Sequence, residues 1–515
     1  RNPEAPIYGV GAWIITEFLP DEQVVMEPNP YYYGNAPKVD RVIMRKFADA
    51  QTEALALLSG EIDIASRGLT AENVAQLEGE DGVTVATIDG GLLLYYVVNS
   101  QLAPSNDSNV RQAFAAILDR DEIVDRVYGG GVEPLYSQIQ PGILGANEAF
   151  DDRYGSPDID LAIELMAASG YTPDNPAQIL IGFPGARYGD GSVDAQTVIA
   201  EQLEATGLFE VELESAEASA YFDALFGGET YNFGFLAFGF DFPDPDNHVG
   251  LFISEGGLGT GVTTADNEPN SDQAAELQAL LKAGATTTDV GERVAIYGDL
   301  QDLYAEMVVT LPMWRMGPFI AYSNEVSGDA SLPNADALNV GALQTFIYAT
   351  LSLGAAPATT AAPAQEEATT LIVGTTYGWD SLDPADATDY GGGELLQNYN
   401  EALLSFAPGS TDLQAGIAEL PEISDDGLTY TLRLRDGVMF GDGTELTAPM
   451  YVEQFQRVLT LGGDTSSNVV PYVDSVEATD DRTIVFTLLD NFAFFSNLLA
   501  LPAYGPAHPD HFPSD

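Results

Sequence analysis

Apolar residues along the chain form short runs and helically spaced stretches that follow one another in turn. Residues 92–99 (LLLYYVVN) are a continuous apolar run, which is typical of a strand buried on both faces. Residues 428–435 (LTYTLRLR) alternate between apolar and polar positions, as a half-buried strand does. Residues 110–128 and 448–461 have helical spacing and each predicts one helix. This alternation of strands and helices predicts an α/β protein.

The same reading predicts further elements on both sides of a low-complexity segment. Residues 354–370, rich in Ala, Thr and Pro and without periodicity, predict a flexible linker. Further strands are expected at 23–26, 41–45, 179–183, 211–213, 233–238, 371–375 and 483–488, and further helices at 48–59, 161–169, 195–206, 273–285 and 290–307. A chain of 515 residues is too long for one core, so two or three lobes are expected.

The net charge of the chain limits the kinds of partner that it can bind. It carries 79 acidic and 18 basic residues, a formal net charge of −61. Such a surface repels phosphate backbones and anionic lipid headgroups, so no nucleic-acid partner is expected. An acidic coat also keeps a protein soluble, and salt would relieve its self-repulsion.

The sequence lacks the residues or motifs that several kinds of functional site require. The absence of cysteine excludes disulfides and cysteine-based zinc sites. No run of 18 apolar residues predicts a membrane span. No nucleophile elbow, phosphate-binding Gly-rich loop or His-Glu-x-x-His motif is present, so neither an enzyme nor a cofactor or metal site is expected. His508 and His511, which flank a Pro-Asp pair, are expected to be loop residues.

Six segments combine glycine, proline and charged residues in distinctive patterns. They are 29–41 (NPYYYGNAPKVDR), 57–65 (LLSGEIDIA), 110–120 (VRQAFAAILDR), 238–245 (FGFDFPDP), 381–389 (SLDPADATD) and 432–448 (LRLRDGVMFGDGTELTA). Together they resemble signatures of the family 5 solute-binding proteins, the peptide, dipeptide and nickel receptors of ABC importers. The order differs, because in the family the segments found here at 371–515 come first. The chain therefore resembles a circularly permuted member, with residues 9–13 (GVGAW) and 449–452 (PMYV) departing from the family pattern.

The resemblance implies an α/β fold of the two-lobed, periplasmic-binding-protein-like clamshell type, class II with an extra subdomain, in permuted order. It divides the chain into residues 1–97 (part of lobe I), 98–318 (lobe II), 319–353 (return strands of lobe I), 354–370 (linker), 371–413 (the natural N-terminal part of lobe I) and 414–515 (the extra subdomain). Chain ends of compact domains often lie close together at the surface, which makes such a rearrangement tolerable.

A free peptide carries an ammonium and a carboxylate, and each needs an opposite charge when it leaves water. Asp241, between two phenylalanines after the predicted strand 233–238, falls on the family position that binds the ligand's ammonium. Arg187 lies in a strand–helix loop where the dipeptide-binding branch places a carboxylate-binding arginine. The alternatives are an ordinary turn aspartate, as expected for Asp244 and Asp246, and a surface arginine paired with one of many acids.

Aromatic side chains are expected to line the ligand's side-chain pockets. The candidates are Phe238, Phe240, Tyr377 and Trp379. Such rings make apolar contacts without requiring one ligand sequence. Packing in a core is an equally good reading of each of them.

The resemblance implies a monomeric, extracytoplasmic receptor, lipid-anchored in its precursor, that captures di- or oligopeptides between its lobes and delivers them to an ABC permease. Two alternatives remain open. The same fold could bind a non-peptide solute such as a metal chelate, an opine or a sugar, because fold does not fix function. The chain could also be an engineered, permuted binding scaffold.

Overall fold

The structure is a computed structural model. It describes residues 4–66, 68–87, 92–129, 131–185, 187–228, 230–254, 271–317, 319–328, 348–353, 369–387, 390–407, 410–462, 464–467 and 469–512. Most of the predicted linker, residues 354–368, lies outside these ranges.

Two compact units make up the chain. Unit 1 combines Arg1–Asp89 with Pro318–Asp515, and unit 2 is Gly90–Gly317. Among the described residues, each unit is built on a large sheet of its own, of seven strands in unit 1 and six in unit 2. The lobe boundaries implied by the family resemblance stay a prediction.

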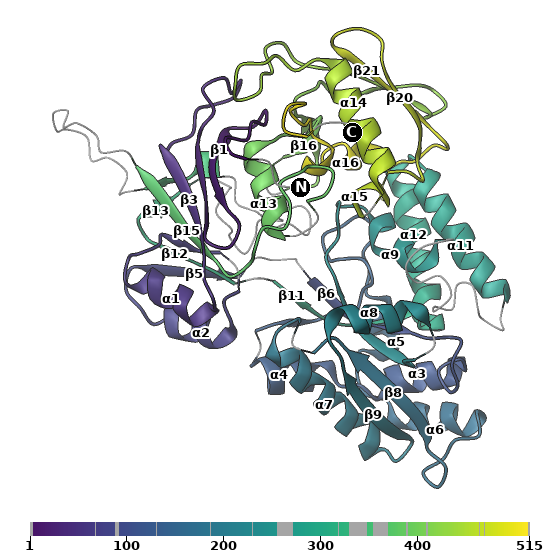
Figure 1. Ribbon diagram of the computed structural model, residues 1–515. Coiled ribbons are helices and arrows are strands. Elements are labelled where there is room, and N and C mark those ends of the chain that lie inside the picture. Colours follow the sequence, from purple (N-terminus) through teal and green to yellow (C-terminus); the bar gives the residue numbers. More distant parts are fainter. Residues whose placement is uncertain are drawn as a thin grey trace. The chain divides into compact units, whose positions relative to one another are not determined.

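The seven-stranded sheet of unit 1 is assembled from distant parts of the sequence (Figure 1). Its order is β1 (Trp13–Leu19), β2 (Gln23–Pro28), β3 (Arg41–Lys46), β15 (Thr370–Thr375), β4 (Ile64–Ala65), β12 (Phe319–Ser323) and β5 (Val83–Thr87). β15 pairs in parallel with both β3 and β4. It is the strand that joins the two halves of the sheet, so the N-terminal strands depend on a segment more than 300 positions away for their central partner.

In its described ranges, the rest of unit 1 contains one smaller sheet, two strand pairs and several helices. The four-stranded sheet has the order β18 (Glu422–Ile423), β19 (Thr429–Arg433), β21 (Thr483–Leu488) and β20 (Val473–Ala478). The strand pairs are β13 (Val326–Ser327) with β14 (Ser352–Leu353) and β16 (Leu404–Phe406) with β17 (Leu413–Ala415). The helices are α1 (Ala50–Leu58), α2 (Ala71–Leu77), α13 (Tyr390–Tyr399), α14 (Ala448–Leu461), α15 (Asp464–Ser467), α16 (Phe495–Leu498) and the 3-10 turns Tyr348–Thr350 and Pro502–Tyr504.

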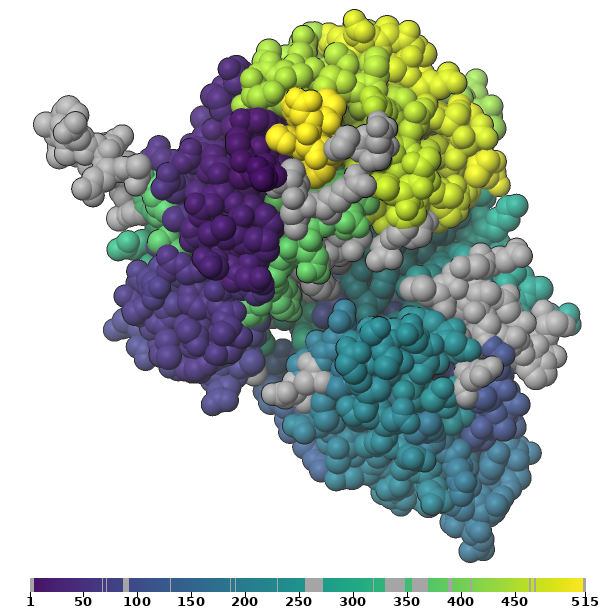
Figure 2. All heavy atoms as spheres, viewed as in Figure 1, coloured from purple at the N-terminus to yellow at the C-terminus, as the bar shows by residue number. Residues whose placement is uncertain are grey.

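Segments near the two ends of the chain meet within unit 1. The ring of Tyr8 lies 5.3 Å from that of His511, and the Gly441 amide donates to the Gly9 carbonyl over 3.1 Å. The early (purple) and late (yellow) parts of the chain adjoin on the surface shown in Figure 2. Gly9 is required here, because a Cβ at this position would come within 2.0 Å of the Tyr399 carbonyl oxygen. Residues 8 and 511 are therefore neighbours in space.

The six-stranded sheet of unit 2 mixes parallel and antiparallel strands. Its order is β7 (Glu133–Pro134), β11 (Thr310–Met316), β6 (Leu92–Val98), β10 (Phe233–Phe238), β8 (Ala177–Phe183) and β9 (Phe209–Ser215). β10, β8 and β9 run parallel to one another, whereas β6 is antiparallel to β10. The carboxyl ends of three strands consequently share one edge, the edge where β6 begins and β11 ends.

The helices of unit 2 connect and cover these strands (Figure 1). They are α3 (Ser108–Ile117), α4 (Arg120–Tyr128), α5 (Ala149–Tyr154), α6 (Ile159–Ala168), α7 (Asp190–Ala205), α8 (Ala218–Gly227), α9 (Pro245–Ile253), α11 (Ser271–Thr286) and α12 (Val290–Met307). The prediction of one helix over 110–128 is wrong. Leu118 is extended, and Asp119 caps a new helix by accepting a hydrogen bond from the Glu122 amide, because a capping side chain satisfies an amide that lacks a helical partner.

Candidate functional site

Two oppositely charged side chains lie in neighbouring loops at the carboxyl edge of the parallel strands in unit 2. Arg187 follows the end of β8 by four residues, and Asp241 follows the end of β10 by three. β8 and β10 pair in parallel, so both loops leave the same edge of the sheet. Both side chains are exposed to solvent. Ligands of open α/β sheets bind outside the carboxyl ends of strands, which makes this edge the candidate site.

The loop that carries Asp241 is tied to the first turn of α9. The Asp241 amide donates to the Asn247 side-chain oxygen over 2.8 Å, and the Asn247 side-chain nitrogen donates to an Asp241 carboxylate oxygen over 3.3 Å. Pro245 starts the helix at a position where its missing amide hydrogen costs nothing. Asn247 therefore fixes both the backbone and the carboxylate of Asp241.

The Arg187 side chain rests on an aromatic ring. Its guanidinium carbon lies 5.4 Å from the ring centre of Phe222 in α8, within the range of a cation–π interaction. The Arg187 amide donates to the Pro184 carbonyl over 3.2 Å, which closes a turn immediately after β8. The predicted alternative, an ion pair with a surface acid, is not found among the described residues.

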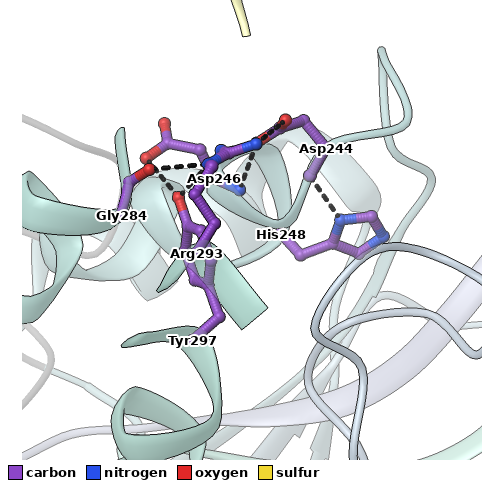
Figure 3. Close-up of polar contacts among 6 residues, drawn as sticks. All are labelled: Asp244, Asp246, His248, Gly284, Arg293 and Tyr297. Carbon is purple, nitrogen blue, oxygen red and sulfur yellow. Dashed lines mark hydrogen bonds and ion pairs between the residues drawn. The ribbon is translucent and has the colours of Figure 1, made fainter. Parts of the chain in front are cut away.

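Asp244 and Asp246, a few residues after Asp241, belong to a buried charged cluster (Figure 3). Arg293 of α12 binds both carboxylate oxygens of Asp244, at 2.9 and 3.0 Å, and also donates to the Gly284 carbonyl. Tyr297 donates to the Asp246 carboxylate over 3.3 Å. The prediction that Asp244 and Asp246 are ordinary turn residues is wrong, because both are buried and linked to α12.

Burial shifts the titration of two groups in this region. Burial, together with the nearby Asp244 carboxylate, raises the pKa of Asp246 to about 7. Burial lowers the pKa of His248 to about 4, although a hydrogen bond between its Nδ1 and the Asp244 carbonyl, 3.1 Å apart, opposes the shift. The contacts of Asp244 and Asp246 with α12 thus fix the position of α9, and with it that of Asn247, within unit 2.

The predicted aromatic residues lie in different surroundings. Phe238 is half-buried, and Phe240 is buried with its ring centre 5.2 Å from that of His248. Trp379 is 3% exposed and belongs to the core of unit 1, as the packing alternative describes, whereas Tyr377 is 42% exposed. Arg187, Asp241, Phe238 and Phe240 belong to unit 2, and Tyr377 and Trp379 to unit 1. Their contacts with a ligand stay a prediction.

Several residues of the recognised motifs have structural roles. Asp383 in the segment 381–389 forms a buried, bidentate ion pair with Arg457 of α14. Arg111 and Arg120 are buried, and both donate to backbone carbonyls within unit 2. Asp442 accepts a hydrogen bond from the Thr444 amide at a tight turn and contacts His508. These residues of the motifs therefore stabilise the fold.

In the described part of the chain, no group of three or more His, Asp or Glu side chains could hold a metal ion. Nor is any described helix long and apolar enough to cross a membrane.

A comparison with family models identifies the chain's relatives. The model described as "Bacterial extracellular solute-binding proteins, family 5 Middle" matches residues 1–260 and 412–515. The chain belongs to this family. The predicted family and the predicted α/β fold of the periplasmic-binding-protein type are thereby confirmed.

Curated members of family 5 match parts of the chain. "Di/tripeptide-binding protein 2" of Pseudomonas aeruginosa is 26% identical over 322 residues, which cover 62% of this chain and 58% of the relative. "Periplasmic oligopeptide-binding protein OppA" of Escherichia coli is 31% identical over 173 residues, 33% of this chain and 32% of the relative. The chain therefore spans less than two thirds of the length of the curated relatives it matches.

Solved structures of family 5 proteins share the fold. A putative peptide binding protein, AppA from Clostridium difficile, superposes with a TM-score of 0.57 at 22% identity, covering 67% of each chain. DppA from Helicobacter pylori, solved with the peptide STSA, gives a TM-score of 0.53 at 23% identity, covering 67% of this chain and 63% of its own.

The sequence did not predict three residues that contact the candidate site or the cluster beside it. Asn247 and Phe222 act on Asp241 and Arg187 through contacts between separate elements, and Arg293 reaches Asp244 from 49 positions away. One local pattern could have indicated Asn247: the Asp-Pro-Asp-Asn sequence at 244–247 is typical of a helix that starts with an N-terminal cap, which places Asn247 in its first turn.

Proposed function

We propose that this chain is the substrate-binding component of an ABC importer, which captures short peptides and delivers them to a membrane permease. The observation that carries the proposal is the pair of opposite charges, Arg187 and Asp241, in neighbouring loops at one edge of the unit 2 sheet. A zwitterionic peptide needs both charges at once. The names of the relatives, which bind di-, tri- and oligopeptides, point to the same ligand class.

The test begins with native mass spectrometry of the purified protein. A peptide mass released from the protein is expected, and the same peptide should bind to the emptied protein in calorimetry. The mass of a metal chelate, an opine or a sugar would instead support the alternative ligand class and contradict the peptide proposal.

Asp241→Asn then tests the proposed ammonium site. The substitution is expected to cost about 2–5 kcal/mol of peptide binding, as for truncating one member of a buried ion pair. Asp160→Asn is the matched control, because Asp160 is an exposed aspartate in the first turn of α6. Equal peptide affinity in both variants would remove Asp241 from the site.

We further propose that the protein acts outside the cytoplasm, that its precursor is lipid-anchored, that it works as a monomer, and that it has no catalytic activity. The description of the family as extracellular solute-binding proteins supports the first and last of these. Globomycin-sensitive processing of the precursor would support a lipid anchor, and unprocessed, unmodified precursor would contradict it.

The circularly permuted order is also a proposal. The central position of β15 and the proximity of Tyr8 to His511 support it, since in the family order the segment that contains residue 511 precedes the segment that contains residue 8. A chain rearranged to place 371–515 before 1–353 should therefore fold with unchanged near-UV circular dichroism and bind the same ligand. Failure of that chain to fold would contradict the permutation.

A further inference from the structure

Two histidines of unit 1 lie where three segments of the chain meet. The segments are residues 7–11, 440–444 and 506–512. The ring centres of His508 and His511 are 4.9 Å apart, and the Tyr8 ring lies 6.1 Å from the His508 ring and 5.3 Å from the His511 ring. The Phe440 ring contacts the His508 ring edge to face, with 4.9 Å between the centres. These four rings, the histidine cluster, therefore link all three segments.

The hydrogen bonds of His508 match its neutral form. The Asp510 amide donates to His508 Nδ1 over 3.2 Å, so this nitrogen carries a lone pair and no hydrogen. The other ring nitrogen, Nε2, lies 3.2 Å from an Asp442 carboxylate oxygen. An ionised carboxylate can only accept a hydrogen bond, so Nε2 carries the hydrogen. A second proton, on Nδ1, would remove the hydrogen bond from the Asp510 amide.

His511 has a buried ring nitrogen that a positive charge would not suit. In the part of the chain that the structure describes, its Nε2 makes no hydrogen bond. A protonated imidazole carries a hydrogen on both nitrogens, so a charged His511 would bury an N–H group without an acceptor. Burial, together with the adjacent His508, lowers the pKa of His511, although the carboxylates of Asp510 and Asp442 oppose the shift. Tyr8 is the other titratable group in contact with this ring.

Protonation of His511 is consequently coupled to folding around it. An imidazole in an unfolded chain titrates near about pH 6.5. The pKa of His511 is lower in the folded protein, because of burial and His508. A group with a lowered folded-state pKa contributes stability that is fully present above the unfolded value and is lost as the pH falls through the folded value. Mild acid should therefore weaken the contacts of His511, and neutral pH should restore them.

The segments that carry His508, His511 and Phe440 are turns and loops, whereas the smaller sheet of unit 1 is a continuous ladder. The Gly443 amide donates to the Phe440 carbonyl over 2.9 Å, and the His511 amide donates to the His508 carbonyl over 3.0 Å, so a local bond closes each turn. β19 and β21 instead pair over five residues. Loops with local bonds open at a lower free energy than strands in a sheet. Acid is therefore expected to act on these segments before it acts on the sheets.

We propose that the histidine cluster is an acid-sensitive contact: a proton on the cluster loosens residues 440–444 and 506–512 while the sheets of unit 1 stay folded. The inference goes beyond the proposed ligand capture, because the cluster belongs to unit 1, whereas Arg187 and Asp241 belong to unit 2. It gives unit 1 a local response to pH that the proposed function does not include.

Nuclear magnetic resonance of the full chain follows the cluster directly, because only three histidines contribute ring signals. The His511 signal should titrate below about pH 6.5. Hydrogen exchange, corrected for the intrinsic effect of pH, measures the consequence. Between about pH 7.5 and about pH 5, the protection of residues 440–444 and 506–512 should fall by at least about twofold, whereas β19 and β21 should keep theirs.

Two variants test whether charge on the cluster causes this change. His511→Phe keeps a ring against Tyr8 but cannot be charged, so the protection of the two segments should no longer depend on pH. Asp442→Asn still accepts from the Thr444 amide but loses a charge that favours protonated His511. In this variant the His511 titration and the loss of protection should both move to lower pH.

A His511 titration at or above about pH 6.5, or an unchanged pH response in His511→Phe, overturns the inference. An equal loss of protection in β19 and β21 also overturns it, since the response to acid would then be global. Should His511→Phe fail to fold, Asp442→Asn decides the outcome, and a titration that stays in place or moves to higher pH contradicts the inference. None of these measurements uses a ligand, so the peptide function stands or falls separately.

Discussion

Asn247 forms two hydrogen bonds with Asp241. The Asn247 side-chain oxygen accepts one from the Asp241 amide over 2.8 Å, and the Asn247 side-chain nitrogen donates one to the Asp241 carboxylate over 3.3 Å. Asn247 lies in the first turn of α9, and the N-terminal cap of this helix, Asp244, forms a buried ion pair with Arg293. The buried Asp244–Arg293 ion pair thus anchors α9, and α9 positions Asn247. Asn247 in turn restrains the exposed carboxylate of Asp241. These contacts orient Asp241 in advance, so less conformational freedom would be lost if the proposed ligand binds there.

Asn247→Ala should therefore weaken peptide binding without abolishing it. Removing hydrogen bonds of this kind costs about 0.5–1.5 kcal/mol, which corresponds to roughly a twofold to tenfold rise in Kd. Calorimetry measures the change. Asn175→Ala is the control, because the Asn175 side chain bonds the Gly170 carbonyl in an exposed turn. Equal peptide affinity in the two variants would show that Asn247 has no positioning role.

Local sequence patterns predicted the elements well but not the contacts between them. Helices 448–461 and 290–307 and strands 233–238 and 483–488 were predicted to the residue, because each carries its own periodicity and boundary signals. The break at Asp119 was missed, since the apolar spacing of 110–128 continues across it while a single capping side chain interrupts the helix. The periodicity of apolar residues indicates which positions are buried, but it does not show where a capping side chain starts a new helix.

The site was predicted only in part, for a similar reason. The strand ends and the family resemblance placed Arg187 and Asp241 in loops, and the structure shows these loops at one edge. Asp244 and Asp246 looked like turn residues, because nothing near them in sequence reveals Arg293 or Tyr297 on another helix. Long-range pairing decides whether an aspartate is exposed or buried, and the local sequence pattern does not show which distant residue will pair with it.

Asp383→Ala should destabilise unit 1 strongly. Asp383 and Arg457 have side chains that are 1% and 4% exposed, and removing one member of a buried pair costs about 3–5 kcal/mol because the other charge is left without compensation. Urea unfolding measures the effect. Glu27→Ala breaks the exposed pair with Arg41 and should cost less than about 1 kcal/mol.

A double variant, Asp383→Leu with Arg457→Met, distinguishes the ion pair from the packing around it. Replacing both charges with apolar side chains should recover most of the lost stability, because no charge is then buried alone. A double variant as unstable as Asp383→Ala would show that the geometry of the pair, and not its compensation of charge, stabilises this region.

Salt should stabilise the folded chain. With 79 acidic and 18 basic residues, the compact state suffers self-repulsion that the expanded chain relieves. The Debye length falls from about 10 Å at 0.1 M salt to about 3 Å at 1 M, so screening removes most of this repulsion over that range. The melting temperature in KCl should rise most steeply at low salt and then level off. A temperature that stays constant or falls would contradict the role of charge.

The last prediction concerns Asp246, whose protonation should control stability near neutral pH. Burial and the adjacent Asp244 carboxylate raise its pKa to about 7, whereas an aspartate in an unfolded chain titrates near about 3.9. A group with a raised folded-state pKa contributes stability that is fully present below the unfolded value and is lost as the pH rises through the folded value. Asp246→Asn cannot ionise and should not lose this stability. The free energy of unfolding of the variant relative to the unchanged protein should therefore increase from about pH 4 to about pH 7 and remain constant above.

Urea unfolding of both proteins across that range measures the difference directly. His248, whose pKa burial lowers to about 4, is present in both proteins, so its titration cancels in the comparison. Asp244→Asn is the control, because Asp244 holds Arg293 through two hydrogen bonds and its loss should destabilise the fold throughout this range. If Asp246→Asn instead loses stability relative to the unchanged protein as the pH rises, the Tyr297 hydrogen bond and the nearby Arg293 charge stabilise the Asp246 carboxylate more than burial penalises it.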